Sequence, residues 1–473
     1  MGVSLNITIK LKLSNRPGTL AKVLEAIAKE GGSLGAIEMV SASPTHNIRE
    51  LFIRLKDQGN LQKLLGSVKE LPNVQVISTS DRVFSRHLEG KIEIKTKRPI
   101  KNWEDLALVY TPGVARISEA IADNKEMATE LTMKRNSVAI ITDGSAVLGL
   151  GNVGPYAGLP VMEGKAALFK QFANIDAFPL CLDASDPDEI ISIVAACSPG
   201  FGGINLEDIA APKCFEIEKK LSEMLDIPVF HDDQRGTAVV NLAGLINALK
   251  VVGKELEDVQ IVISGAGAAG AAISRLLITA GAKNIVVCDR KGAIARDNIP
   301  DNTFKQWIAE NTNQNCKHGS LKEVIKGVDV FIGVSAPGLL NREDILKMNK
   351  KPIVFALANP EPEIDPDEIH DIAGVIATGR SDYPNQINNA LAFPGIFRGA
   401  LDSHATTIND QMCMAAAHAL ASIIAEEELI AENIIPSIFN NEVVKTVAKA
   451  VEEEAKNTGV VKQSLYKIEK DFI

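Results

Sequence analysis

The first eighty residues alternate between apolar and polar positions with two different periods. Four segments read as strands, in which apolar residues recur at every second position. Two other segments repeat apolar residues every three or four positions, the period of an amphipathic helix. The strands are expected at residues 5–13, 33–43, 49–56 and 74–80, and the helices at residues 19–32 and 60–71. This order predicts a ferredoxin-like βαββαβ domain over residues 1–85.

A polar, basic connector, SRHLEGKIEIKTKRPI, follows and predicts a domain boundary. Beyond it, short apolar runs such as SVAIITDG and QIVISG alternate with helical segments. Runs of this kind, ended by turn residues, are typical of parallel strands buried on both faces. We therefore expect an α/β fold with a substrate domain at 86–225 and a Rossmann-type dinucleotide-binding domain at 226–395. A helical C-terminal segment at 396–473 is expected to complete the catalytic region.

The composition is that of an ordinary globular protein. The chain has 473 residues, of which 46% are hydrophobic, and a formal net charge of −10. Binding to nucleic-acid backbones requires clustered Lys and Arg, so this charge argues against nucleic acid as a partner. The six cysteines include no C-x-x-C pair and indicate buried free thiols in a reducing compartment. With no signal peptide and no apolar run long enough for a bilayer, the sequence predicts a cytoplasmic protein without a membrane partner.

Two stretches match the dinucleotide motif G-x-G-x-x-G, and they differ in their surroundings. The second, SGAGAAGAAIS, follows an apolar run and precedes a helix rich in small residues, and Asp289 stands nineteen positions after Gly270 (289 − 270). A strand, a glycine loop, a helix N-terminus and an acid about 20 residues further on together bind a dinucleotide. The first, LGLGNVGPYAG, places Pro155 directly after Gly154, and no helix is expected before about Gly164. We expect the nucleotide at the second stretch, with a tight structural turn as the alternative.

Two pairs of adjacent carboxylates accompany this nucleotide domain. Glu207 and Asp208 follow GGINL, and Asp232 and Asp233 follow PVFH. Either pair alone is also compatible with charges at a helix start or with an N-cap. Together they predict a hard divalent cation, Mg²⁺ or Mn²⁺, bound by carboxylate oxygens. His231, which precedes the second pair, is expected to be packed or hydrogen-bonded and not a ligand.

Tyr110 in LVYTPGVA and Lys165 in PVMEGKAALFK are candidates for proton transfer. A lysine in a partly desolvated pocket beside a dication loses its proton more readily and can act as a base near neutral pH. Residues of these two types are more often structural or solvated than catalytic, so spacing alone assigns neither of them a role.

Five long motifs, taken in order, resemble those of the decarboxylating malic enzymes of the bacterial type. They are VYTPGVA, DGSAVLGLGNVGPYAGLPVMEGKAALFK, FGGINLEDIAAPKCFEIE, VFHDDQRGTA and NQINNALAFPGIFRGAL, and the resemblance extends from about Leu88 to the C-terminus. In that family the first glycine stretch belongs to the substrate domain and shapes the cleft. Tyr110 matches the family's proton donor and Lys165 its proton-accepting lysine. The other matches are the metal ligands Glu207, Asp208 and Asp233, the nucleotide loop Gly265, Ala266, Gly267, Ala268, Ala269 and Gly270, and Asn359 and Asn389, which face nicotinamide and substrate.

The resemblance implies oxidation and decarboxylation of L-malate to pyruvate and CO₂, with reduction of NAD or NADP. Lys165 would take the C2 hydroxyl proton while hydride leaves to the nicotinamide. The metal would chelate the substrate and polarise the new C2 carbonyl, and Tyr110 would protonate C3. Ala146 stands where large-subunit relatives carry a substrate-binding arginine, so the residue that binds the C4 carboxylate is unassigned.

The coenzyme is not fixed by these residues. Asp289 favours NAD, because its carboxylate accepts the ribose 2′-hydroxyl and repels a 2′-phosphate. Arg290 and Lys291 can bind that phosphate, which leaves NADP open.

The N-terminal unit, with RPGTLAKVL after its first strand, resembles an ACT domain, a regulatory module that often binds amino acids. The resemblance implies a small effector, such as an amino acid, at a loop of Asn15, Arg16, Gly18 and Thr19. Backbone N–H groups at the following helix start can donate hydrogen bonds to an effector carboxylate. A purely structural or dimerising domain is the alternative. The family resemblance also implies a homodimer or a higher homo-oligomer.

Other functions stay open at this point. A malolactic enzyme would convert malate to lactate with the nicotinamide retained, and the product distinguishes it. An oxaloacetate decarboxylase would share the metal site without needing the loop at Gly265. A non-catalytic amino-acid sensor is a third reading, against which the presence of Tyr110, Lys165 and all three matched metal ligands argues.

Overall fold

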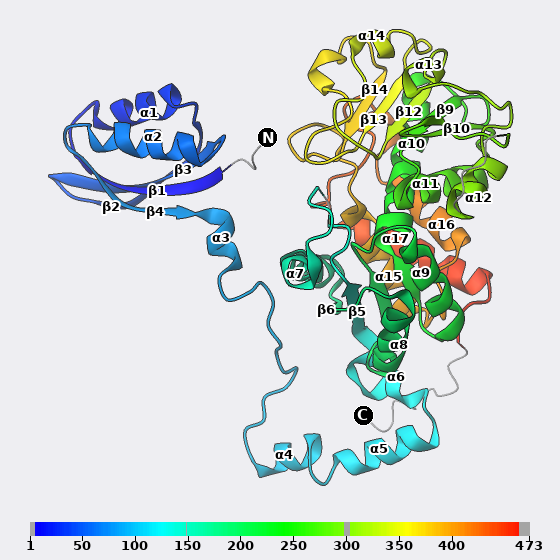
Figure 1. The fold of residues 1–473 in the computed structure, drawn as a ribbon. Helices are drawn as coiled ribbons and strands as arrows, with labels where there is room; N and C mark the ends of the chain where they lie inside the picture. Colours follow the sequence, from blue (N-terminus) through cyan, green and yellow to red (C-terminus); the bar gives the residue numbers. More distant parts are fainter. Residues whose placement is uncertain (1–4, 148, 298–302, 463–473) are drawn as a thin grey trace. The chain divides into compact units, whose positions relative to one another are not determined.

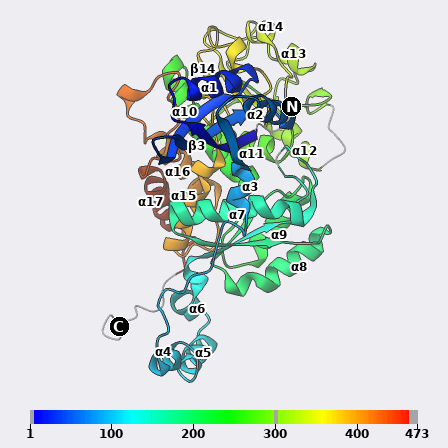
Figure 2. The ribbon, with the colours of Figure 1, turned by 90° about the vertical axis from the view of Figure 1, so that its left-hand side faces the viewer.

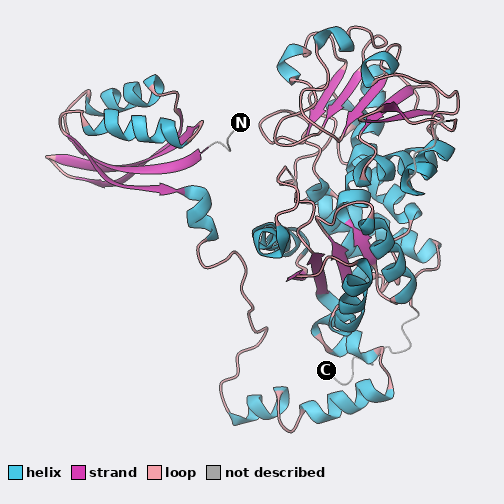
Figure 3. Cartoon of the chain, in the orientation of Figure 1, coloured by secondary structure: helices cyan, strands magenta, loops and turns pink. Residues whose placement is uncertain are grey.

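The computed structural model describes residues 5–147, 149–297 and 303–462, and the chain divides into two compact units, Met1–Glu93 and Ile94–Ile473. Figure 3 shows the helices and strands of each unit. Among the described residues, no helix is long and apolar enough to cross a membrane.

The first unit is an antiparallel sheet with two helices packed on one face (Figure 1). The strand order is β2-β3-β1-β4. Apolar side chains of β1 alternate in burial, and Ile9 and Leu11 pack with Val23 and Leu64 of the helices. The predicted βαββαβ fold is confirmed. The elements are β1 (Leu5–Ser14), α1 (Thr19–Lys29), β2 (Ser33–Ala42), β3 (His46–Leu55), α2 (Gln58–Lys69) and β4 (Val74–Asp81), followed by α3 (Arg82–His87).

In the second unit, four short helices precede a small parallel sheet of order β6-β5-β7-β8. α7 packs on one face of this sheet, where Phe169 meets Val138, and α8 and α9 cover the other face, where Ile217 meets Ile141 (Figure 2). The helices are α4 (Trp103–Val109), α5 (Val114–Asp123), α6 (Met127–Leu131), η1 (Met133–Asn136), α7 (Gly154–Ala173), α8 (Pro187–Cys197), η2 (Ser198–Gly200) and α9 (Lys213–Met224). The strands are β5 (Ser137–Thr142), β6 (Asp176–Cys181), β7 (Gly203–Leu206) and β8 (Val229–His231).

The second sheet has the order β11-β10-β9-β12-β13-β14, parallel except for the pairing of β10 with β11. Chain order reverses between β9 and β12, and dinucleotides bind at such a switch point, outside the carboxyl ends of the strands. The strands are β9 (Gln260–Ser264), β10 (Asn284–Asp289), β11 (Gly292–Ala293), β12 (Val330–Gly333), β13 (Ile353–Ala356) and β14 (Val375–Thr378). The predicted Rossmann-type domain is confirmed.

The remaining helices connect the two sheets and surround the second one. The turn η3 (Asp232–Gly236), a π-helical turn, and α10 (Thr237–Val252) lead from β8 into the second sheet. Around that sheet lie α11 (Ala268–Thr279), α12 (Thr303–Asn311), α13 (Leu321–Val324), α14 (Arg342–Ile345), η4 (Pro366–Glu368) and η5 (Asn389–Leu391). The helical C-terminal segment contains α15 (Phe393–Asp402), α16 (Asp410–Ala421), η6 (Glu426–Glu428) and α17 (Glu442–Asn457).

Two local expectations are wrong, and one strand was not predicted. No helix was expected before about Gly164, but α7 begins at Gly154, because Pro155 in its first turn lacks only an N–H that has no intrahelical partner there. The run GINL forms a buried strand, β7, which was missed from the sequence. The cysteines are free, as expected, but Cys197 is exposed and not buried.

Candidate active site

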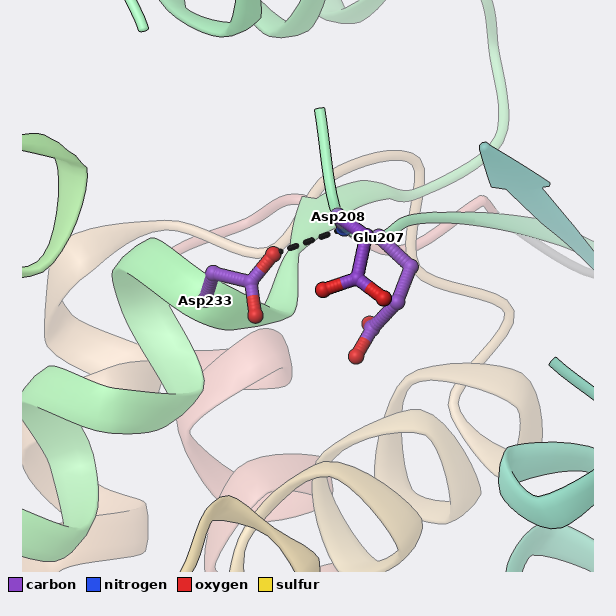
Figure 4. Close-up of side chains that lie close together, drawn as sticks. All are labelled: Glu207, Asp208 and Asp233. Carbon is purple, nitrogen blue, oxygen red and sulfur yellow. Dashed lines mark hydrogen bonds between the residues drawn. The ribbon is translucent and has the colours of Figure 1, made fainter. Parts of the chain in front are cut away.

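Three carboxylates meet at one edge of the small sheet. Glu207 and Asp208 follow β7, and Asp233 lies in η3 after β8, the neighbouring parallel strand. One ligand oxygen from each lies within 4.8 Å of the others (Figure 4). The backbone N–H of Asp208 donates to Asp233 Oδ2 at 2.8 Å, which links the two segments. The structure therefore brings together all three predicted metal ligands.

The donor set fits a divalent cation. All three side chains offer oxygen, the donor that Mg²⁺ and Mn²⁺ prefer. Asp208 Oδ2 is buried and has no hydrogen-bond partner among the described residues, as a ligand oxygen would. Asp208 also adopts a φ of +52°, in the left-handed region, and such backbone strain in a non-glycine residue is concentrated at functional sites. These are features of a preformed cation site.

The electrostatics of the cluster call for positive charge. Burial raises the pKa of Glu207 and of Asp208, and the Asp233 carboxylate raises both further. Burial likewise raises the pKa of Asp232. A cation bound between Glu207, Asp208 and Asp233 would stabilise the ionised forms of these three carboxylates.

Lys165 is buried beside this cluster. It comes from α7, and its ammonium group pairs with Glu207 Oε2 and Asp232 Oδ2. Burial by itself lowers the pKa of Lys165, but the neighbouring carboxylates, Asp232 first, outweigh it and the pKa is raised. The Nζ atom also lies 4.4 Å from the centroid of the Phe393 ring. The lysine is thus held in one place, against a ligand of the cation site.

Asparagines complete the surroundings of the lysine. A Cβ atom on Gly236 would lie 1.9 Å from Asp232 Oδ1 and 3.4 Å from Asn389 Cβ, which places this predicted substrate residue near Asp232, the partner of Lys165. Asn205 Nδ2 donates to Glu207 Oε2 at 3.0 Å and orients that carboxylate. Asn205 and the pairing role of Asp232 were missed from the sequence. For Asp232 the only signal in the sequence was its place next to Asp233, and two adjacent acids do not show which of them faces a lysine.

The second glycine stretch forms a close strand–loop–helix junction. Gly265 has a φ of +118°, and a Cβ atom there would lie 2.6 Å from Val334 O. A Cβ atom on Gly270, in the first turn of α11, would lie 1.8 Å from Gly265 O. The N-terminus of α11 therefore begins directly at the loop, with Ala266, Ala268 and Ala269 around it, and offers its free N–H groups there.

The predicted ribose acid lies at the end of β10. Asp289 Oδ1 accepts from the backbone N–H of Lys291 at 2.7 Å, and Asp289 Oδ2 pairs with Lys305 of α12. Burial raises the pKa of Asp289, but these two partners outweigh it and the pKa is lowered. Asp289 is therefore an ionised carboxylate with a lysine beside it, and the sequence analysis did not identify that lysine.

The first glycine stretch lies against the loop that carries Asn359. A Cβ atom on Gly149 would lie 3.5 Å from Asn359 O. Glu363, fully buried, braces the same loop, because its carboxylate accepts the N–H groups of Ser335 at 2.9 Å and Ala358 at 3.1 Å. The first stretch thus lies next to the loop of the nucleotide-binding half that carries Asn359.

Tyr110 is not brought to the lysine within the chain. It follows α4 and is 67% exposed, and α4 and α5 lie apart from α7 in both views (Figures 1 and 2). The helices α4, α5 and α6 have no buried residue. Trp103 is 85% exposed and Leu108 is 70% exposed. This segment therefore presents exposed apolar side chains.

In the first unit, the loop between β1 and α1 is held by hydrogen bonds. Asn15 Nδ2 donates to Ser43 O at 3.1 Å, and Thr19 Oγ1 donates to Arg16 O at 3.0 Å. Gly18 caps α1 with a φ of +85°, and no side chain caps the helix. The first turn of α1 contains no acidic residue, so its N–H groups are not occupied by a local carboxylate.

A carboxylate cation site with a buried lysine, next to a dinucleotide-type loop, defines a metal-dependent and nicotinamide-dependent dehydrogenase. Comparison with known families narrows this class. Residues 89–222 match "Malic enzyme, N-terminal domain", residues 234–456 match "Malic enzyme, NAD binding domain", and residues 2–78 match "ACT domain". The chain belongs to the malic enzyme family, and its first unit is an ACT domain.

Individual relatives agree with this assignment. The chain is 54% identical to the NAD-dependent malic enzyme of Geobacillus stearothermophilus over 98% of this chain and 97% of that protein. It is 54% identical to the bifunctional malic/malolactic enzyme of Bacillus subtilis over 79% of this chain and 92% of that protein. The crystal structure of malic enzyme from Pyrococcus horikoshii matches 80% of this chain and 92% of that one, with 49% identity and a TM-score of 0.77. NADP-dependent malic enzymes of several bacteria match as well.

Proposed function

We propose that the protein catalyses the oxidative decarboxylation of L-malate to pyruvate and CO₂, with reduction of NAD and dependence on Mg²⁺ or Mn²⁺. The observation that carries the proposal is Lys165, buried between Glu207 and Asp232 beside the three-carboxylate site. The test is the absorbance of reduced nicotinamide with L-malate and Mn²⁺, in parallel with NAD and NADP. Metal-dependent reduction with pyruvate as product is expected, and no reduction with either coenzyme would contradict the proposal.

The roles of the side chains follow from their chemistry. A divalent cation held by Glu207, Asp208 and Asp233 would supply a Lewis acid for the C2 oxygen of malate. Lys165 takes the proton of the C2 hydroxyl group, for which it must itself be deprotonated. A cation that draws Glu207 away from the ammonium group favours that neutral form. Once the C2 hydride has passed to NAD and C2 is a carbonyl, loss of the C4 carboxylate as CO₂ leaves an electron pair at C3, and a tyrosine hydroxyl at that position donates the proton that completes pyruvate.

Tyr110 supplies that proton, in our proposal, from a second copy of the chain. The exposed apolar side chains of α4 and α5 support this, because surfaces of this kind mark protein–protein contacts. Leu150 and Tyr156, at the first glycine stretch and the start of α7, are 70% and 87% exposed and offer a receiving surface at the start of the helix that carries Lys165. The protein is then a homodimer in which each copy completes the other's active site.

The coenzyme is NAD in our proposal. Asp289 is ionised and lies at the end of β10, where it can accept the ribose 2′-hydroxyl. Lys305, which pairs with Asp289, is a positive charge at this end of β10 that a 2′-phosphate would meet. NADP is the alternative, and we expect the parallel assay to give a higher kcat/KM with NAD.

Malolactic conversion is a second candidate, because a relative with 54% identity carries that activity in its name. Both reactions begin with the same proton removal by Lys165. They differ in whether the reduced nicotinamide leaves or reduces pyruvate within the site. Lactate formed without net coenzyme reduction would favour this alternative, and pyruvate formed in step with reduced coenzyme would exclude it as the main activity.

The ACT domain senses a small effector, which we propose to be an amino acid bound at the loop of Asn15, Arg16, Gly18 and Thr19. The uncapped start of α1 supports this, since its N–H groups can donate hydrogen bonds to a carboxylate. The hydrogen bonds of Asn15 keep the loop in a fixed shape, which favours binding of a defined ligand.

A further inference from the structure

One buried carboxylate outside the cation site holds both ends of the segment that carries Asp233. Glu218 lies on the buried face of α9. Its Oε1 atom accepts a hydrogen bond from the backbone N–H of His231 at 3.3 Å and forms an ion pair with Arg235, whose Nε atom lies 2.8 Å away. The residues between His231 and Arg235 include Asp232, which pairs with Lys165, and Asp233 of the cation site.

The same helix is tied to the other half of the cation site. α9 begins at Lys213, a few residues after Asp208, so Glu218 and the ligands Glu207 and Asp208 belong to one continuous stretch of chain. Glu218 therefore joins the β7 side of the site to the β8 side. This link is separate from the hydrogen bond of Asp208 to Asp233.

Arg235 is itself anchored to the C-terminal helices. Its Nη1 atom donates to Ile408 O at 2.8 Å and lies 3.7 Å from Asp410 Oδ1. The turn is closely packed, because a Cβ atom on Gly236, the residue that follows Arg235, would lie 1.9 Å from Asp232 Oδ1. Movement of either end of this turn is therefore transmitted to the two aspartates within it.

We propose that Glu218 and Arg235 are a positioning pair that sets the affinity of the carboxylate site for its divalent cation without contacting cation or substrate. This inference rests on the proposed function, which requires that site. Metal–oxygen distances tolerate changes of only about 0.2 Å, so a small displacement of Asp233 weakens binding. Residues that orient metal ligands in this way typically change metal affinity by about 10- to 100-fold when they are replaced.

The test measures Mn²⁺ binding to the full-length protein by the electron paramagnetic resonance signal of free Mn²⁺, without substrate or coenzyme. Glu218→Gln keeps the volume of the side chain and removes its charge. A cavity of about 1030 Å³ borders the pair, so water can reach Arg235 when that charge is lost. Glu216→Gln is the matched control, because Glu216 lies on the same helix and makes a surface pair with Lys220 at 2.8 Å. Thermal unfolding of each variant is recorded alongside.

We expect Glu218→Gln to raise the Mn²⁺ dissociation constant by about tenfold or more. Arg235→Gln should have a similar effect, and the double variant should be little worse than either single one, because the two residues act as a unit. At saturating Mn²⁺ the Glu218→Gln enzyme should regain most of its kcat, whereas Glu216→Gln should bind Mn²⁺ as the wild type does. Wild-type Mn²⁺ affinity in Glu218→Gln would overturn the inference, including when its unfolding temperature falls.

A second variant separates this inference from the proposed function. Asp233→Asn removes a ligand and should abolish Mn²⁺ binding at the site. If Asp233→Asn abolishes binding and Glu218→Gln leaves it unchanged, only the positioning role is refuted. If Asp233→Asn itself binds Mn²⁺ normally, both the cation site and the positioning role are refuted.

Discussion

Replacing Gly270 with alanine tests the assignment of the second glycine stretch to the nucleotide. A Cβ atom at Gly270 would lie 1.8 Å from Gly265 O, whereas ordinary contacts begin at 3.4 Å. The start of α11 must therefore move by about 1.6 Å (3.4 − 1.8) relative to the loop. Gly265 has little room to give way, since it packs against Val334 and its N–H bonds to Cys288 O at 2.9 Å.

The displacement has two energetic consequences. Forcing a methyl group into a closely packed position costs ~1–3 kcal/mol, and the better helix propensity of alanine offsets ~1 kcal/mol of this. The displaced helix also carries its N–H groups away from the pyrophosphate. Loss of one hydrogen bond to a charged group costs ~1.5–3 kcal/mol, which corresponds to roughly 10- to 100-fold weaker binding of NADH.

The assay is a fluorescence titration of NADH into each variant, with thermal unfolding as a second readout. Gly267→Ala is one control: its Cβ atom meets nothing within 4 Å, so its unfolding temperature should stay unchanged while the methyl group hinders the pyrophosphate. Gly151→Ala, in the first stretch, should keep wild-type NADH affinity. Wild-type affinity in Gly270→Ala, or an equal loss in Gly151→Ala, would refute the assignment.

Three further predictions concern the partner copy, the coenzyme and the effector. Mixing inactive Tyr110→Phe and Lys165→Met subunits should restore about a quarter of the wild-type activity, because half of the dimers are mixed and each mixed dimer carries one intact site. If the subunits exchange and no activity returns, both residues belong to the active site of one chain. Asp289→Ala should lower the ratio of kcat/KM with NAD to kcat/KM with NADP by roughly tenfold, because the ribose contact and the charge that repels a 2′-phosphate are both lost. An unchanged ratio would argue against Asp289 as the residue that selects the coenzyme. In a panel of amino acids, at least one should raise the unfolding temperature of the wild type and change its activity. Gly18→Val should abolish that response, because a φ of +85° does not suit valine. An unaltered response in this variant would argue against the loop as the effector site.

The helices and strands could be predicted because the repeat of apolar residues that identifies each of them lies within a few neighbouring positions of the sequence. The alternation along β1 indicates a strand buried on one face, and the continuous apolar run QIVIS before Gly265 indicates a strand buried on both faces. The start of α7 was missed for the same local reason: Pro155 was taken as a helix breaker, although the first turn of a helix accepts proline. β7 was missed because GINL is short and leads directly into two acids.

The three carboxylates could be predicted as a group because two adjacent acidic pairs each follow an apolar run. The family resemblance then selected Glu207, Asp208 and Asp233. What the sequence lacks is a signal for pairing across elements. Lys165 and Asp232 are 67 positions apart, and only the packing of α7 on the small sheet brings them together.

The positions of Glu218 and Tyr110 had no local signal either. Glu218 is one glutamate among several on α9, and only its burial against η3 distinguishes it from exposed Glu216. Tyr110 lies in a motif that resembles the family's, but a motif says nothing about whether its helix packs on its own chain. The exposed face of α4 and α5 became visible only in the folded chain.

The most direct test of the central claim is the turnover of Lys165→Met with L-malate, Mn²⁺ and NAD. This variant keeps an unbranched side chain and removes the nitrogen that accepts the substrate proton. If Lys165 is the base, kcat should fall by ~10²–10⁴-fold while the folded protein still binds NADH. Turnover close to that of the wild type would contradict the account of this site.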